Sequence, residues 1–473
     1  MIRCWILLVA LVFAQSGFGQ ENRSLQQRKG GGHGLPASDF RTQVPEHPLD
    51  MILGRPTLHS VTLSVLAYQE LEGYVAYGNI KGEYSKATPR QTFHSGQPVH
   101  LLIEGLLPNT RYYYQLHSRP AGNGNLVAGP EYSFTTGKPA GSGFTFTIQA
   151  DSHLDNGTSP DIYRQSLATV KASKPDFHID LGDTFMDDKY AEFKASHAQY
   201  LAQRYYFGLV GTDSPVFLVL GNHDGESVDH GGAGPDSMAV WANTMRKKYF
   251  PNPLPDGFYS GNTIDQPYVG LLQDYYAWEW GDALFVVLDP FWYTSRKTRD
   301  GDNWPRTLGL QQYNWLKHTL ESSHSKFKFV FIHHLSGGES REGRGGAEAA
   351  RFFEWGGHEL NGADTFLQNR PGWPMPIHQM LLRNKVSAVF HGHDHLYVKQ
   401  DLDGIVYQEV PQPSHARGST QSATEYGYKS GVLLPSSGII RVDITPAKVS
   451  VQYISSNPGS EGRVMHSYAI EPK

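Results

Sequence analysis

Five short polar segments lie between residues 151 and 395, and each follows an apolar stretch of the kind that forms a buried strand. They supply carboxylates, imidazoles and one amide. In chain order they are residues 151–153 (DSH), 182–183 (GD), 221–224 (GNHD), 333–334 (HH) and 391–395 (HGHDH). Ligand sites of α/β sheets lie at the carboxyl ends of the strands. The segments therefore predict an α/β fold that gathers all five at one edge.

The pattern around these segments supports that fold class. Ser159 and Pro160 are the typical first residues of a helix, and the apolar residues from Leu310 to Leu320 mark a second helix. Apolar runs that we expect to be strands alternate with such helices. These runs are residues 144–150, 177–181, 216–220, 283–288, 327–332 and 386–390.

The five segments have the chemistry of a site for two metal ions. A carboxylate shared between two cations reduces their mutual repulsion, and we expect Asp183 to be shared. Asp151 and His153 are two residues apart, so they point the same way from an extended chain. Oxygen and imidazole ligands together favour Fe, Mn or Zn over Ca or Mg. The small residues Gly182, Gly221 and Gly392 allow the backbone to approach the ions closely.

The segments resemble the calcineurin-like metallophosphoesterase superfamily, whose pattern is D-x-H, G-D, G-N-H-D/E, H and G-H-x-H. The resemblance covers roughly residues 144 to 400. It implies a four-layer α/β sandwich. It also implies that Asp151, His153, Asp183 and His395 bind one ion, and that Asp183, Asn222, His333 and His393 bind the other. His223 would face the substrate, with Asp224 orienting it.

Together with the region in front, the chain is similar to the purple acid phosphatases. Those enzymes have a metal-binding tyrosine three residues after the shared aspartate, where this chain has Met186, and they lack a counterpart of His153. The resemblance implies a phosphate monoester hydrolase that uses water activated between two metals. Without the tyrosinate we expect no purple colour. A phosphodiesterase on nucleotides or glycerophosphodiesters, and a non-catalytic binding protein with a vestigial site, stay open as alternatives.

The pattern of the region in front, residues 56–137, predicts a β-sandwich. The stretch from Leu107 to Tyr112 resembles the fibronectin type III signature, in which the tyrosine hydroxyl closes a corner between strands. We expect a signal peptide over residues 1–19, a flexible lead-in over 20–55 and the metallophosphoesterase domain over 144–460.

Composition and the N-terminus limit the partners and the location. Lysine and arginine number 41 against 46 aspartate and glutamate, so the chain has no basic footprint for nucleic acid and no polybasic membrane patch. The apolar run from Cys4 to Ala14 is too short to span a bilayer, and no later run is long enough. We expect a secreted or periplasmic protein that acts on a small phosphate ester; an uncleaved anchor is the alternative. The oligomeric state stays open.

Several other residues have less certain roles. His334 is a candidate substrate contact, although it could replace His333 as a ligand, and Arg344 is a candidate phosphate or carboxylate contact. The long segment 335–376 is either a lid over the substrate or a decorated surface loop. His391 is expected to support the ligands or pack, and His178 to be a core residue. We expect Asp187 and Asp188 to be solvated.

Overall fold

The N-terminal region forms a β-sandwich. The computed structural model describes residues 34–338, 340, 342–416 and 418–473. One sheet has the order β1 (Leu49–Gly54), β2 (Ser60–Ala67), β6 (Val99–Glu104). The other has the order β4 (Lys86–Ala87), β3 (Leu71–Gly78), β7 (Arg111–Pro120), β8 (Val127–Ala128), with β5 (Gln91–Phe93) on β3 and β9 (Tyr132–Thr135) on β7. Inward-facing side chains such as Leu63, Val75 and Tyr114 fill the core between the sheets. The Tyr112 hydroxyl accepts a hydrogen bond from the backbone N–H of Leu107 (3.0 Å), which is the corner contact that the sequence predicts.

The lead-in expected over residues 20–55 is partly wrong. Residues 20–33 lie outside the described residues, as does the expected signal peptide. After them come a short 3-10 helix, η1 (Ala37–Asp39), and strand β1, which pairs with β2 along its whole length. Phe40 is buried and stacks on Tyr190 at 3.9 Å. Apolar residues in this stretch are therefore held in place by packing. The glycine-rich composition of the residues before them gives no sign of this packing in the sequence.

The rest of the chain is built on two sheets packed face to face. One has the order β12 (Val216–Leu218), β11 (Phe177–Asp180), β10 (Phe144–Gln149), β23 (Gly438–Ile444), β24 (Val449–Ser455), β25 (Val464–Ile470). The other has the order β13 (Ser260–Gly261), β16 (Tyr276–Trp280), β17 (Ala283–Val287), β18 (Phe327–Phe331), β19 (Ala388–His391), β21 (Ile405–Glu409), β20 (Leu396–Leu402), β22 (Val432–Pro435). Phe146, Phe285 and Phe331 meet between the sheets with ring centroids 5.2–6.3 Å apart. The sheet continues to β25, so the end expected at residue 460 is too early.

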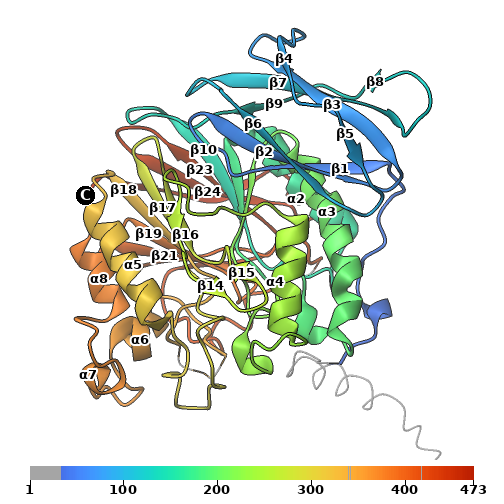
Figure 1. The fold of residues 1–473 in the computed structure, drawn as a ribbon. Helices are drawn as coiled ribbons and strands as arrows, with labels where there is room; N and C mark the ends of the chain where they lie inside the picture. Colours follow the sequence, from blue (N-terminus) through green and yellow to red (C-terminus); the bar gives the residue numbers. More distant parts are fainter. Residues whose placement is uncertain (1–33, 339, 341, 417) are drawn as a thin grey trace, which may run out of the picture.

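Helices cover the outer faces, which completes the expected four layers (Figure 1). Helices α2 (Pro160–Ser173) and α3 (His197–Gly211) pack on the first sheet, and the Ser159 hydroxyl caps α2 as the sequence predicts. Helices α5 (Gly309–Ser322), α6 (Phe353–Gly356) and α8 (Ile377–Arg383) pack on the second. Smaller elements are α4 (Met238–Tyr249), α7 (Phe366–Asn369), the hairpin β14 (Asp265–Gln266) and β15 (Gly270–Leu271), and the 3-10 turns η2 (Asp187–Lys189), η3 (Phe193–Ser196), η4 (Val228–His230) and η5 (Ala349–Arg351).

The β-sandwich docks on α3 through a buried arginine. The guanidinium of Arg204 donates to the carbonyls of Asp50 and Ser64 (both 3.1 Å), to the Ser64 hydroxyl (2.9 Å) and to the carbonyl of Tyr249 (2.7 Å). Apolar residues of the first sandwich sheet, including Ile52 and Leu66, pack beside it against the helix. One charged side chain therefore joins the sandwich to the α/β part.

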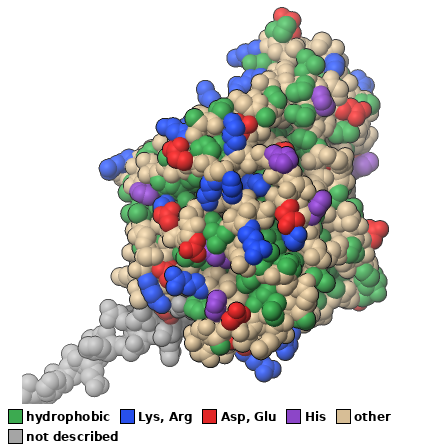
Figure 2. Space-filling model, turned by 90° about the vertical axis from the view of Figure 1, so that its left-hand side faces the viewer, with side chains coloured by type: hydrophobic (Ala, Val, Ile, Leu, Met, Phe, Trp, Pro, Cys, Tyr) green, Lys and Arg blue, Asp and Glu red, His purple; other side chains and the backbone are tan. Residues whose placement is uncertain are grey.

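Most of segment 335–376 forms part of the covering layer. Trp355 and Phe366 are buried on the outer face of the second sheet. None of the helices in the described part of the chain has the length and apolar character that crossing a membrane requires. On the face drawn in Figure 2, basic and acidic side chains are interspersed.

Candidate metal centre

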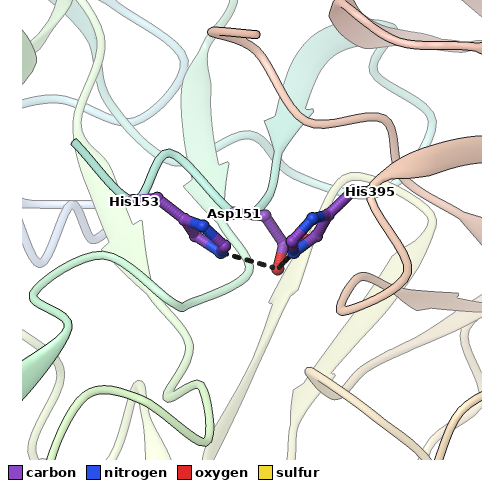
Figure 3. A group of neighbouring side chains, drawn as sticks. All are labelled: Asp151, His153 and His395. Atoms are coloured by element: carbon purple, nitrogen blue, oxygen red, sulfur yellow. Dashed lines mark ion pairs between the residues drawn. The ribbon is translucent and has the colours of Figure 1, made fainter. Parts of the chain in front are cut away.

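The first set of candidate ligands, which we call group A, contains Asp151, His153 and His395. Figure 3 shows both imidazoles turned toward the carboxylate of Asp151. Their Nε2 atoms lie 3.6 Å (His153) and 3.4 Å (His395) from its Oδ1. Asp151 and His153 follow β10, and His395 comes from the turn between β19 and β20. The three side chains are close enough to hold one metal ion.

The second set, group B, contains Asp183, His333 and His393, whose ligand atoms also lie close enough to hold one ion. Asp183 follows β11, His333 follows β18 and His393 follows β19. Oδ2 of Asp183 lies 3.3 Å from Nε2 of His333 and 3.7 Å from Nε2 of His153 in group A. Asp183 therefore lies between the two groups, where a shared carboxylate has to be.

Asn222 is the seventh expected ligand, and it lies in the turn that follows β12. The backbone N–H of the next residue, His223, donates to Oδ1 of Asp183 (2.8 Å), which ties this turn to group B. Oδ1 of Asn222 is buried and has no hydrogen-bond partner among the described residues.

Unpartnered polar atoms show that these residues fit metal ions. Five atoms of the expected ligands are buried and have no hydrogen-bond partner in the described part of the chain. They are Asp151 Oδ1, His153 Nε2, Asp183 Oδ2, Asn222 Oδ1 and His333 Nε2. The other oxygens of the two aspartates are satisfied: Oδ2 of Asp151 accepts from the N–H of His393 (2.9 Å). Leaving such atoms unpaired costs free energy that cation binding recovers.

The backbone at the centre is strained in a way that aims the side chains inward. Asp151, His153, Asp183, His393 and His395 all have positive φ angles, from 54° to 81°. Non-glycine residues with such angles are uncommon and cluster at functional sites. Gly392 is required by close packing, because a Cβ there would lie 2.7 Å from Oδ2 of Asp151.

In each group the pKa of one imidazole is raised and that of another is lowered. Burial alone would lower the pKa of His333, but the carboxylates of Asp183 and Asp151 outweigh it and raise that pKa to about 9. In group A, burial opposes and hydrogen bonds to Asp151 and Asp155 raise the pKa of His153 well above its usual value. Burial and positive neighbours lower the pKa of His395 to about 4 and that of His393 well below its usual value.

His223 lies beside the centre, and its orienting partner differs from the one expected. Its Nδ1 lies 2.9 Å from Oδ1 of Asp188, and its Nε2 lies 3.9 Å from Oδ2 of Asp183. The expectation that Asp224 orients His223 is therefore wrong, as is the expectation that Asp188 is solvated. Asp188 follows a left-handed turn at Met186 that brings the carboxylate back toward the imidazole.

Asp224 instead binds the backbone of the loop that carries Asp183. Its two oxygens accept from the N–H groups of Asp183, Thr184, Phe185 and Gly221 at 2.7–3.1 Å. Burial and the neighbouring Asp183 raise the pKa of Asp224 to about 7. Asp187 is also buried rather than solvated, and accepts from the Tyr200 hydroxyl (2.7 Å).

His334 and Arg344 flank group B. Nδ1 of His334 lies 3.1 Å from the carbonyl of Leu335, and its ring is 5.2 Å from that of His393. It is not among the side chains that come together around a candidate ion. Arg344 donates to the carbonyl of His393 (3.0 Å) and to Oδ1 of Asp394 (2.9 Å), so much of its hydrogen-bonding capacity is already used by the protein.

Several supporting residues escaped the sequence analysis. Asp155 lies 3.4 Å from Nδ1 of His153, and Glu409 lies 2.6 Å from Nδ1 of His391. Such carboxylates set which imidazole nitrogen faces a metal. Asp155 lies two residues after His153, so the pattern D-x-H continues as D-x-H-x-D. This spacing could have identified Asp155 from the sequence. Glu409 lies at the end of β21, and no sequence pattern indicates its contact with His391. His178 is in the core as expected, with Nδ1 2.9 Å from the Thr147 hydroxyl.

Comparisons with known proteins agree with this geometry. A family model described as calcineurin-like phosphoesterase matches residues 144–397, more than half of the chain. The solved structure of PhoD has a TM-score of 0.66 at 15% identity, and the match covers 91% of this chain and 92% of that one. A purple acid phosphatase, PPD1 from yellow lupin (Lupinus luteus) seeds, has a TM-score of 0.60 at 14% identity, covering 89% of this chain and 74% of that one. At these identities the structures show a shared fold. No curated protein matches the chain in sequence.

Proposed function

The chain belongs to the calcineurin-like phosphoesterase family and is a metal-dependent phosphoester hydrolase, and we propose that it hydrolyses phosphate monoesters at a centre of two metal ions. The observation that carries this proposal is the convergence of groups A and B on Asp183, with unpartnered polar atoms in both groups. The fold shared with a purple acid phosphatase supports the monoester assignment.

We propose Asp151, His153, Asp183 and His395 as the ligands of one ion, and Asp183, Asn222, His333 and His393 as those of the other. Bound there, two cations would activate water and stabilise charge on the phosphoryl oxygens. The neutral amide of Asn222 adds a ligand without adding negative charge, which leaves the centre attractive to a phosphate. Fe, Mn and Zn all suit this mixture of oxygen and imidazole ligands.

His223 is the group that we propose to act on the substrate directly. Asp188 accepts from the Nδ1–H group of His223, so Nε2 faces the centre near Asp183 and carries a proton when the ring is an imidazolium. In this position His223 can stabilise a phosphoryl oxygen or donate a proton to the leaving oxygen. Asp224 keeps the loop of Asp183 in place by accepting from three of its backbone N–H groups.

A secreted or periplasmic location is also part of the proposal. It rests on the short apolar run near the N-terminus.

Rates on 4-nitrophenyl phosphate and on bis(4-nitrophenyl) phosphate test the proposed substrate class. The purified protein is first analysed for its metal content and then assayed on both esters. We expect about two metal ions per chain and a higher kcat/KM on the monoester. A higher value on the diester would instead favour a phosphodiesterase.

A further inference from the structure

Two buried glutamines of α3 lie behind the candidate metal ligands. Gln199 and Gln203 are fully buried and one helical turn apart, so they point from the same side of the helix. Both contact the turn after β10 (residues 151–154), which carries the first two ligands of group A, and the loop after β11 (residues 183–185), which begins with the shared aspartate. The glutamines therefore contact the supports of both groups at once.

Each glutamine joins the two segments through its amide NH₂ group. Nε2 of Gln199 donates to the carbonyl of His153 and to that of Thr184 (3.0 Å). Nε2 of Gln203 donates to the hydroxyl of Ser152 (2.8 Å) and to the same Thr184 carbonyl (3.0 Å). The turn after β10 is thus tied to the loop after β11 at two successive points.

The orientation of both amides is fixed by their partners. Carbonyl oxygens only accept, so the NH₂ end of each side chain has to face the two segments. At the other end, Oε1 of Gln199 accepts from the Tyr190 hydroxyl (3.0 Å), and Oε1 of Gln203 accepts from the Tyr163 hydroxyl (3.2 Å). A carboxylate of the same shape could not donate to the two segments.

The segments that these amides hold have a strained backbone. Asp151, His153 and Leu154 in the turn after β10, and Asp183 in the loop after β11, have φ angles of 53–60°. Such angles are unfavourable for residues other than glycine and persist only where surrounding contacts enforce them. The two amides supply such contacts, and the helix that carries them is itself fixed to the β-sandwich through Arg204.

We infer that Gln199 and Gln203 are positioning residues, which hold the two ligand-bearing segments at the separation that lets groups A and B share Asp183. They act through the backbone that carries the ligands and not on the substrate. This inference rests on the proposed centre of two metal ions.

The test replaces each glutamine by methionine, which has a similar length but no N–H group to donate. The variants are titrated with Mn²⁺ and their electron paramagnetic resonance spectra are recorded. Two Mn²⁺ ions that share a carboxylate give the spectrum of a coupled pair, and Gln199→Met should convert much of it into the spectrum of separate ions. The affinity for Mn²⁺ should fall about 10–100-fold, as is usual for residues behind metal ligands.

The size of the effect should depend on what each amide contacts. Gln203 bonds to a side-chain hydroxyl of the turn after β10 and not to the backbone of a ligand, so Gln203→Met should show a smaller effect of the same kind. Gln199→Glu keeps the shape of the side chain but turns an oxygen toward the two carbonyls. This variant should lose at least as much as Gln199→Met.

Two controls separate positioning from a loss of stability. Gln311→Met replaces an exposed glutamine of α5 and should leave the affinity and the spectrum unchanged. The Tm of every variant is also measured. A glutamine that only stabilised the fold would lower Tm and leave the spectrum of the folded, Mn²⁺-loaded protein as in the wild type, which would overturn the inference.

Wild-type affinity and coupling in both methionine variants would also overturn it, because the two segments would then keep their separation without the amides. If Gln199→Met does not fold, Gln203→Met and Gln199→Glu decide the same question. A wild type that binds only one Mn²⁺, or two without coupling, would contradict the proposed two-ion centre and the inference with it. Coupling that is present in the wild type and unchanged in the variants contradicts only the inference.

Discussion

Groups A and B contain the same kinds of side chain but are held in different ways. In group B the carbonyl of Leu181, at the end of β11, fixes Nδ1 of His333 (2.8 Å), and the carbonyl of Glu342 fixes Nε2 of His393 (2.9 Å). In group A the side chain of Asp155, itself 28% exposed, fixes His153. His395 is 35% exposed, whereas His333 is fully buried. Backbone carbonyls thus hold the imidazoles of group B, whereas a side chain holds His153 in group A, and His395 of group A is more exposed to solvent.

The strongest test of this comparison removes the residue that both groups share. Asp183→Asn should lose both ions and more than a hundredfold of activity, since even residues behind the ligands are worth about 10–100-fold. Elemental analysis and steady-state rates measure both effects. Asp161→Asn, at a carboxylate that is 89% exposed on α2, is the matched control. Unchanged metal content in Asp183→Asn would contradict its shared position.

Removing His223 should separate chemistry from metal binding. We expect His223→Ala to retain both ions and to lose about 10²–10⁴-fold in kcat, the usual contribution of a positioned acid or base. Asp188→Asn should show a smaller loss of the same kind. A His223 variant that binds fewer ions would show that the imidazole is a ligand and that group B extends further than described.

The Asp155→Asn variant tests the difference in how the imidazoles of groups A and B are held. This change weakens the hold on His153 and touches no residue of group B, so group A should lose about 10–100-fold in metal affinity while group B keeps its ion. Stepwise removal of metal with a chelator should release one ion from the variant well before the other. Simultaneous loss of both ions would show that the two groups bind as one unit.

The smallest expected effect is the dependence of metal uptake on pH. His333, with a pKa of about 9, and His153, with a raised pKa, are protonated near neutral pH in the metal-free protein. A metal has to displace that proton, so affinity at group B should rise about tenfold per pH unit up to about pH 9, and affinity at group A should change in the same direction. Calorimetry in buffers of different ionisation enthalpy should find about two protons released per two ions. Release of none would mean that these imidazoles are already neutral.

The sequence predicts the central strands closely, because each is a short apolar run that ends in a polar segment. Strand β10 was expected over residues 144–150 and is Phe144–Gln149, and α2 begins at its Ser-Pro start as expected. The boundaries that failed, at residues 55 and 460, lie where β1 and β25 add to sheets through long-range pairing. Local pattern carries no information about such partners.

The same reasoning explains what was found at the site and what was missed. Asp151, Asp183 and His333 lie two or three residues after the ends of strands, so their convergence follows from the sheets. Asp188 and His415 lie in loops whose paths depend on turns such as the left-handed one at Met186. Their contacts with His223 and Asp155 join residues that are 35 and 260 positions apart. The local sequence does not predict contacts between residues so far apart.

The buried guanidinium of Arg204 has a consequence for how the protein unfolds. A chain that lost the β-sandwich would leave this cation with the carbonyl of Tyr249 but without its partners on Asp50 and Ser64. The β-sandwich is therefore an integral part of the folded enzyme and not a separately folding domain on a linker. Heating should melt both parts in a single calorimetric transition, and an Arg204→Met variant should split that transition into two.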